Sequence, residues 1–120
     1  MNTETSLFFV ALLPPLDIQD YATQIKQYFA THYHSRAALK SPPHITLQPP
    51  FGWLNAELPA LEECLRDFTS DRTSVSLSLN GFAAFPPRVI YIDVERSTEL
   101  LTLQADLMAE LATKLEIVDR

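Results

Sequence analysis

The order of hydrophobic and polar positions predicts a chain of alternating strands and helices. Residues 7–13 form a short, continuously apolar run that stops at two prolines, as a strand buried on both faces does. We therefore predict a central strand there. Apolar residues then recur at spacings of three and four, which predicts an amphipathic helix that Asp17 caps and that ends at about Thr31.

Two proline pairs bound a second predicted strand, at residues 44–48. Because proline cannot donate to a β-ladder, the pairs favour a short extended segment between them. Polarity alternates along this segment, so successive side chains are expected on opposite faces of the strand. The apolar face, with Ile45 and Leu47, is expected to pack on the core. The other face carries three polar residues, His44, Thr46 and Gln48.

The second half of the chain predicts a helix followed by a hairpin. Residues 59–68 carry one apolar stripe, with a proline suited to the first turn of a helix. Strict alternation at 74–79 and β-branched and aromatic residues at 89–94 predict an antiparallel hairpin. Residues 86–87 supply its turn, and residues 80–81 supply either an alternative turn or a bulge.

The last predicted helix begins at Ser97 or Thr98, either of which can cap it, and ends near Leu115. Residues 117–118 then resemble the approach to another strand. The resulting order is β-α-β-α-β-β-α, which predicts an α+β fold in which helices pack on an antiparallel or mixed sheet. A length of 120 residues, against the roughly 150 of an average domain, favours a single domain spanning 1–120.

The composition limits the partners of this domain. Nine basic and 15 acidic residues give a net charge of −6, which opposes binding to long nucleic acid but permits a small phosphate ligand. The longest apolar run is far shorter than the roughly 20 residues of a membrane span, and no signal peptide is recognisable, so a cytoplasmic location is expected. The single Cys64 cannot form an internal disulfide, and its place on an apolar helical stripe predicts a buried thiol.

The tripeptide His44-Ile45-Thr46 carries two side chains with catalytic groups, an imidazole and a hydroxyl, at a spacing of two residues. On a strand, side chains two residues apart project from one face about 7 Å apart. A neutral imidazole exchanges protons near pH 7 and a hydroxyl donates to a phosphate oxygen, so the pair has the groups for half of a phosphodiester acid/base site. The tripeptide alone more often marks a surface histidine beside an ordinary strand threonine.

Other candidate residues have a simpler structural interpretation. His32 and His34 suit the C-terminal end of a helix better than a metal site. Phe8 and Phe51 have the rings to line a base-binding groove, although aromatic residues beside a strand more often belong to the core. Three cationic residues could help to attract a phosphate, but their simpler interpretation is as exposed charges on loops. They are Arg36, Lys40 and Arg88.

The context of the His44 motif resembles a known family. Residues 41–47, preceded by the apolar strand at 7–13 and an amphipathic helix, are similar to the first half of the two-histidine phosphoesterase superfamily. The nearest branch is that of 2′-5′ RNA ligase-like proteins and cyclic phosphodiesterases. The resemblance covers the chain in element order. It implies a bilobal α+β fold in which two His-x-Thr or His-x-Ser motifs face each other across a groove.

The resemblance also implies an activity. One histidine acts as general base and the other as general acid, while the hydroxyls hold the phosphate of a 2′,3′-cyclic or 2′-5′ linked nucleotide or RNA end. Neither a cofactor nor a metal is required. Residue by residue, His44 and Thr46 match the first motif as its catalytic pair.

A second motif is missing from the sequence, since neither His32 nor His34 is followed two positions later by threonine or serine. We therefore expect a C-terminally truncated two-histidine phosphoesterase domain. Its complete form would be a phosphoric diester hydrolase or RNA ligase-like enzyme, and the chain alone would be weakly active or inactive. One alternative is a non-catalytic module that binds a nucleotide or a protein. Another is a homodimer that brings two copies of His44 together, and the oligomeric state stays open.

Overall fold

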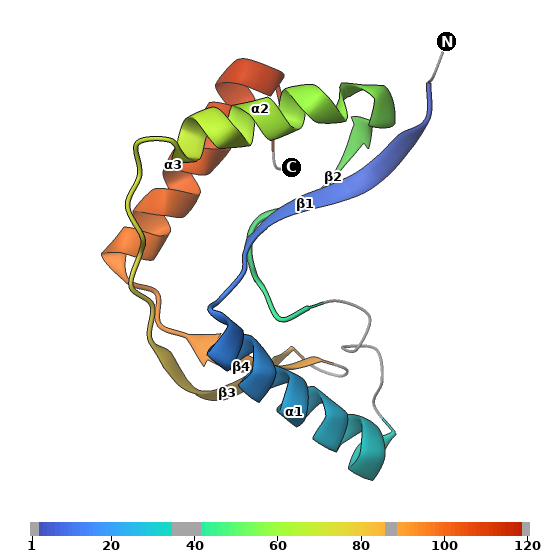
Figure 1. The fold of residues 1–120 in the computed structure, drawn as a ribbon, viewed down its shortest axis with the longest axis vertical. Helices are drawn as coiled ribbons and strands as arrows, with labels where there is room; N and C mark the ends of the chain where they lie inside the picture. Colours follow the sequence, from blue (N-terminus) through green and yellow to red (C-terminus); the bar gives the residue numbers. More distant parts are fainter. Residues whose placement is uncertain (1–2, 35–41, 86–88, 119–120) are drawn as a thin grey trace. The chain divides into compact units, whose positions relative to one another are not determined.

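The computed structural model describes residues 3–34, 42–85 and 89–118 of the chain (Figure 1). Its strands and α-helices follow the predicted β-α-β-α-β-β-α order, and the α+β class is confirmed. In chain order the elements are β1 (Thr5–Leu12), α1 (Leu16–Tyr33), β2 (Ile45–Leu54), the 3₁₀ helix η2 (Asn55–Glu57), α2 (Leu58–Thr69), β3 (Leu79–Phe85), β4 (Val89–Val94) and α3 (Thr98–Leu115).

The chain divides into two compact units. Leu7–Gly52 forms one unit, and the residues on either side of it form the other. The described strands form two sheets of two strands each, β1 with β2 and β3 with β4. The backbone N–H of Asn55, just after β2, donates to the carbonyl of Glu4, just before β1, at 2.9 Å. Because Phe9, farther along β1, lies beside His44 at the start of β2, these two strands run antiparallel.

β1 is not the doubly buried central strand that its continuous apolar run predicts. In the described part of the chain it pairs with β2 alone, and Leu7 is 77% exposed. An apolar run indicates that a strand can be covered, but it carries no information on how many strands pair with it. The strand lies where it was predicted, whereas its prediction as a central strand is wrong for the described residues.

β2 continues through the second proline pair, which was predicted to end it. The strand runs from Ile45 to Leu54, with Pro49 and Pro50 in its interior. Successive N–H groups of a strand point to opposite edges, so one of these two prolines lacks its N–H on the open edge of the two-stranded sheet, where no ladder bond is broken.

Gln48 is not exposed with His44 and Thr46, although the alternation of polarity predicts an exposed polar row of all three. His44 and Thr46 are exposed, but Leu47 and Gln48 are both buried, and Gln48 is only 1% exposed. Two consecutive buried residues break the alternation just before the prolines. The Gln48 amide donates from Nε2 to the carbonyl of Pro49 at 3.0 Å, which offsets part of the cost of burying it.

β3 and β4 form the predicted antiparallel hairpin, but the hairpin begins later than predicted. The register shifts near the start of β3, so that Asn80 and Gly81 together face one residue of β4. The bulge interpretation of this pair is therefore confirmed. Residues 74–78 lie outside β3, although the Glu95 N–H, just after β4, donates to the Ser78 carbonyl at 2.8 Å. The turn predicted at 86–87 lies outside the described residues.

Helices α2 and α3 pack against each other and bury the apolar core of their unit (Figure 1). α2 carries Pro59 in its first turn and α3 ends at Leu115, both as predicted. After α3, Glu116 has a left-handed backbone conformation and the Ile117 N–H donates to the Leu111 carbonyl at 3.1 Å. Ile117 thus closes the helix end, where the approach to a strand was predicted. The buried apolar residues are Leu61, Cys64, Phe68, Leu100, Leu107, Leu111 and Ile117.

Asp17 does not cap α1, contrary to the prediction. The helix begins at Leu16, and Pro15 occupies the N-cap position without a side-chain cap. Asp17 lies in the first turn, where its Oδ1 accepts the Ile18 N–H at 2.9 Å. Pro15 sets the start of the helix. Its restricted φ and its missing N–H do not destabilise a helix at this position, where an N–H has no partner within the helix.

Ser97 caps the N-terminus of α3, as predicted. Its hydroxyl oxygen accepts the Leu100 N–H at 3.1 Å. We expect Ser97→Ala to lower the free energy of unfolding by about 1 kcal/mol, because the variant leaves that N–H without its acceptor. Urea unfolding followed by circular dichroism measures the change. Thr98→Ala, at the first residue of the helix, is the control, and an equal loss in both variants would contradict the capping role.

Candidate functional site

His44 lies directly before β2, with its side chain exposed. Its Nδ1 is 2.8 Å from the carbonyl oxygen of Pro42. A carbonyl oxygen only accepts, so this contact places the proton of the neutral imidazole on Nδ1 and leaves the lone pair on Nε2. The ring is therefore held by the backbone two residues earlier, in the tautomer whose outer nitrogen can take a proton.

Thr46 is the second residue of β2 and is exposed as well. Side chains two residues apart on an extended strand share one face, roughly 7 Å apart along the chain. The intervening Ile45 is half-buried and the next residue, Leu47, is buried, which fits that alternation. The structure leaves both the imidazole and the hydroxyl exposed at the start of β2. Gln48, the third polar residue expected to be exposed in this row, is buried instead.

Phe9 of β1 is the aromatic neighbour of His44. The two ring centroids are 5.1 Å apart and the ring planes are inclined by 43°. Phe9 remains 45% exposed, so much of its ring is open to solvent. The sequence suggests Phe8 and Phe51 as aromatic residues of a groove, whereas the ring that the structure places beside His44 is that of Phe9. The missing information is the pairing of β1 with β2, which decides which residues of β1 lie beside the histidine.

The other histidines lie at the end of α1, as predicted. His32 is exposed, its Nδ1 is 3.0 Å from the carbonyl oxygen of Tyr28, and its ring stacks on the Tyr28 ring at 4.0 Å. His34 closes the helix in a left-handed conformation, and its N–H donates to the Phe29 carbonyl. Within the described ranges, no three residues of histidine, cysteine, aspartate or glutamate are grouped so that they could hold a metal ion.

Three cations considered for a phosphate lie outside the described residues, Arg36, Lys40 and Arg88. Phe8 and Phe51 are both half-buried, in line with a packing role. No helix in the described part of the chain is both long and apolar enough to cross a membrane.

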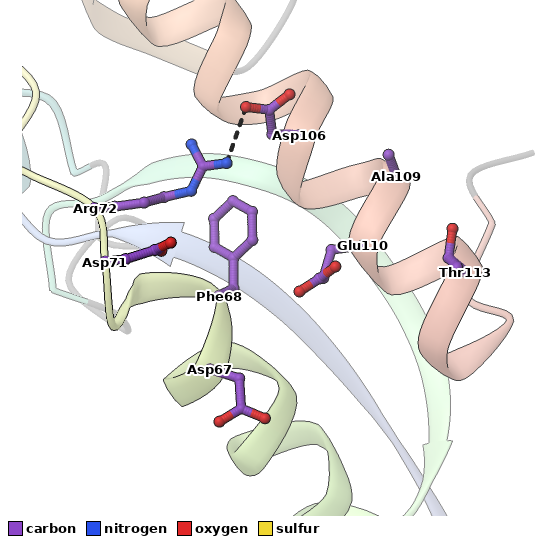
Figure 2. A pocket seen from close by; sticks show the side chains of 8 residues that line it. All are labelled: Asp67, Phe68, Asp71, Arg72, Asp106, Ala109, Glu110 and Thr113. Carbon is purple, nitrogen blue, oxygen red and sulfur yellow. Dashed lines mark hydrogen bonds and ion pairs between the residues drawn. The ribbon is translucent and has the colours of Figure 1, made fainter.

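A pocket of about 500 Å³ lies between α2 and α3 (Figure 2). The guanidinium of Arg72 lies 4.2 Å from the centroid of the Phe68 ring and 2.9 Å from Oδ2 of Asp106. Three further carboxylates line the same pocket, on Asp67, Asp71 and Glu110. Four carboxylates around one paired guanidinium repel an anion, so this pocket is not suited to a phosphodiester.

Cys64 is buried, as predicted, in the packing of α2 on α3. Burial raises the pKa of the Cys64 thiol above its ordinary value of 9.0, and the nearby carboxylate of Glu110 raises it further. Because the thiolate is the reactive form, a higher pKa leaves less of it at any pH near 8. Both burial and ionisation therefore oppose a nucleophilic role for Cys64.

We expect iodoacetamide at pH 8 to alkylate Cys64 much more slowly in the folded chain than in urea. The thiol has to be exposed before it reacts, and its raised pKa lowers the thiolate fraction in the fold. Mass spectrometry over time measures the two rates, with a cysteine-containing peptide in the same urea concentration as control. Equal rates in the folded and unfolded chain would contradict the buried, protonated thiol.

Comparison with known proteins shows a match over most of the chain. The family model described as the 2′-5′ RNA ligase superfamily matches residues 14–119. A Bacillus pumilus protein named "Putative phosphoesterase" is 31% identical over 84% of this chain. A Geobacillus protein with the same type of name is 33% identical over 91% of the chain. These matches span 57% and 62% of the two relatives, so the chain covers somewhat more than half of their length.

Proposed function

This chain belongs to the 2′-5′ RNA ligase superfamily, and we propose that it carries one half of an acid/base site for 2′,3′-cyclic or 2′-5′ phosphodiesters. The observation that supports this most directly is the pairing of an exposed imidazole with an exposed hydroxyl at the start of β2. The hydrogen bond from His44 Nδ1 to the Pro42 carbonyl leaves Nε2 to exchange the proton.

The chemistry follows from these two groups. In hydrolysis of a 2′,3′-cyclic phosphate, water attacks phosphorus and loses a proton, and the leaving ribose oxygen gains one as its bond to phosphorus breaks. His44 performs one of these two proton transfers through Nε2. The Thr46 hydroxyl donates to a non-bridging phosphate oxygen, where negative charge grows in the transition state. Neither step draws on a metal or a cofactor.

The second proton transfer needs a second group. Because the chain spans 57% and 62% of the two phosphoesterase relatives, we propose that this group lies outside residues 1–120. The chain then corresponds to the first part of a two-histidine domain and contributes His44 and Thr46 to a site completed by further sequence. A single acid/base group gives typically 10²–10⁴-fold acceleration, so the 120-residue chain alone is expected to be weakly active.

The test is an assay against 2′,3′-cyclic nucleotides and 2′-5′ linked dinucleotides in the presence of EDTA. The 120-residue chain is compared with the longer product, where the gene encodes one. Turnover of either substrate class by either form, with EDTA present, supports the proposal. If neither form turns over a cyclic or a 2′-5′ substrate, the enzyme proposal fails. A non-catalytic nucleotide-binding module would then be supported by retained binding of a nucleoside monophosphate.

A further inference from the structure

Pro43 lies inside the short loop that the hydrogen bond of His44 closes. It is the residue between Pro42, whose carbonyl oxygen lies 2.8 Å from the histidine Nδ1, and His44 itself. Peptide bonds are planar, so this loop turns about φ and ψ of Pro43, φ of His44 and the side-chain torsions of the histidine. The proline ring fixes the first of these angles at about −65°. Pro43 therefore removes freedom from the segment whose two ends meet in the contact.

We propose that Pro43 is a positioning residue for His44: by fixing the backbone beside the histidine, it keeps the Pro42 carbonyl on Nδ1 and holds the neutral imidazole in the tautomer with a free Nε2. This inference rests on the proposed function, in which Nε2 exchanges the proton, and adds to it the residue that maintains this state. In the other tautomer Nε2 already carries a proton and cannot accept one.

The contact of His44 with Phe9 cannot replace this hydrogen bond. The two ring centroids are 5.1 Å apart and the ring planes are inclined by 43°, so Phe9 limits where the plane of the imidazole lies. A half-turn about the bond to the ring exchanges Nδ1 with a carbon atom and leaves that plane unchanged. Of these two contacts, the one with the Pro42 carbonyl distinguishes nitrogen from carbon, because a C–H group is a much weaker donor than an N–H group.

A strand boundary is the alternative role for this proline pair. The other pair, Pro49 and Pro50, lies inside β2, so two adjacent prolines do not by themselves end a strand in this chain. The two roles also have different consequences. A boundary would depend on Pro42 and Pro43 alike, whereas positioning depends on Pro43 alone, because φ of residue 42 lies outside the loop and any residue at that place supplies the carbonyl.

The test compares alanine substitutions at the two adjacent prolines. Pro43→Ala frees φ inside the loop, whereas Pro42→Ala keeps both the carbonyl and the fixed angle. Long-range proton–nitrogen NMR spectra at pH 8 show which ring nitrogen of His44 carries the proton. We expect the ratio of the Nδ1–H to the Nε2–H tautomer to fall about two- to fivefold in Pro43→Ala, the scale of the freedom that a proline removes from one residue. Pro42→Ala is expected to keep the ratio.

His32 is the reference in the same spectra. Its Nδ1 lies 3.0 Å from the Tyr28 carbonyl oxygen, so its neutral ring is expected to carry the proton on Nδ1 as well. A change of ratio confined to His44 supports the inference, and an equal change in both histidines would overturn it. Pro43→Gly frees the backbone further and is expected to lower the His44 ratio more than Pro43→Ala does.

Turnover of adenosine 2′,3′-cyclic phosphate shows whether the tautomer matters for the reaction. In the most active form of the protein, Pro43→Ala is expected to lower kcat by the same factor, about two- to fivefold, and to leave KM unchanged because the Thr46 hydroxyl is not altered. Pro50→Ala, at an exposed proline within β2, is the control for kcat. A lower tautomer ratio with unchanged kcat would overturn the positioning role.

The outcomes separate this inference from the proposed function. An unchanged tautomer ratio in Pro43→Ala, or an equal fall in Pro42→Ala, would overturn the inference and leave the proposed function standing. If the ratio falls in Pro43→Ala alone but no form of the protein turns over a cyclic or a 2′-5′ substrate, the control of the imidazole by Pro43 is supported and the enzyme proposal fails.

Discussion

His44→Ala is expected to lower kcat for 2′,3′-cyclic nucleotides by about 10²–10⁴-fold, the range for the loss of one general acid or base. The imidazole is exposed and is held through Nδ1 by the Pro42 carbonyl, so in the proposed mechanism Nε2 exchanges the proton. Alanine removes that nitrogen without adding bulk. Initial rates of phosphomonoester formation measure the effect in the most active form of the protein.

Two controls show whether the loss is chemical. His32→Ala removes another exposed histidine, on α1, whose ring stacks on Tyr28, and is expected to leave kcat unchanged. Free imidazole added to His44→Ala is expected to restore part of the rate, because it supplies the missing proton-transfer group. Full activity in His44→Ala would remove His44 from the mechanism, and an equal loss in both variants would indicate a structural effect.

Leu111→Ala is expected to have the largest effect on stability, a loss of about 2–5 kcal/mol in the free energy of unfolding. Leu111 is 0% exposed in the core where α3 packs on α2, and its carbonyl accepts the Ile117 N–H that closes the helix. Alanine leaves a cavity that the two packed helices can fill only partly. Urea unfolding measures the change through its midpoint and slope.

Leu101→Ala is the matched control, since Leu101 lies on the same helix and is largely exposed. The same substitution there removes the same atoms but opens no cavity, so a loss well below 1 kcal/mol is expected. If the two variants lost similar stability, the packing of α2 on α3 would not be the core of this unit.

The helices were predictable because their signals are local. Apolar spacing of three and four predicted all three, and the end of α3 at Leu115 and its cap at Ser97 were confirmed. Capping depends on a hydroxyl and an N–H three residues apart, which the sequence contains directly. Asp17 shows the limit of such local signals, because Pro15, two positions earlier, can also begin a helix and is the residue that does so in the structure.

The strands were less predictable because their pairing and burial depend on residues that are distant in the sequence. Residues 7–13 do form most of β1, but no apolar pattern states how many strands will pair with it. The burial of Gln48 beside Leu47 was not predictable from the alternation of polarity, because that pattern does not state what covers each face of the strand. The hairpin was predicted, but its length depended on where its partner strand ends.

The candidate site was predictable only for those residues that lie close together in the sequence. The spacing of His44 and Thr46 on an extended segment fixes a shared face without knowledge of the fold, and the structure keeps both side chains exposed there. Phe9 could not be found in this way, because 35 positions separate it from His44 and only strand pairing brings them together. The contact between the His44 imidazole and the Pro42 carbonyl was likewise not predictable from the sequence and is known only from the structure.

The two prolines within β2 have a consequence for the solubility of the chain. In an extended strand, successive N–H groups point to opposite edges, so one of Pro49 and Pro50 removes a donor from the edge that faces away from β1. That edge has no partner strand among the described residues. A second molecule that added itself there as another strand would meet a gap in the ladder of hydrogen bonds. The proline pair thus protects an open β-edge against cross-β aggregation.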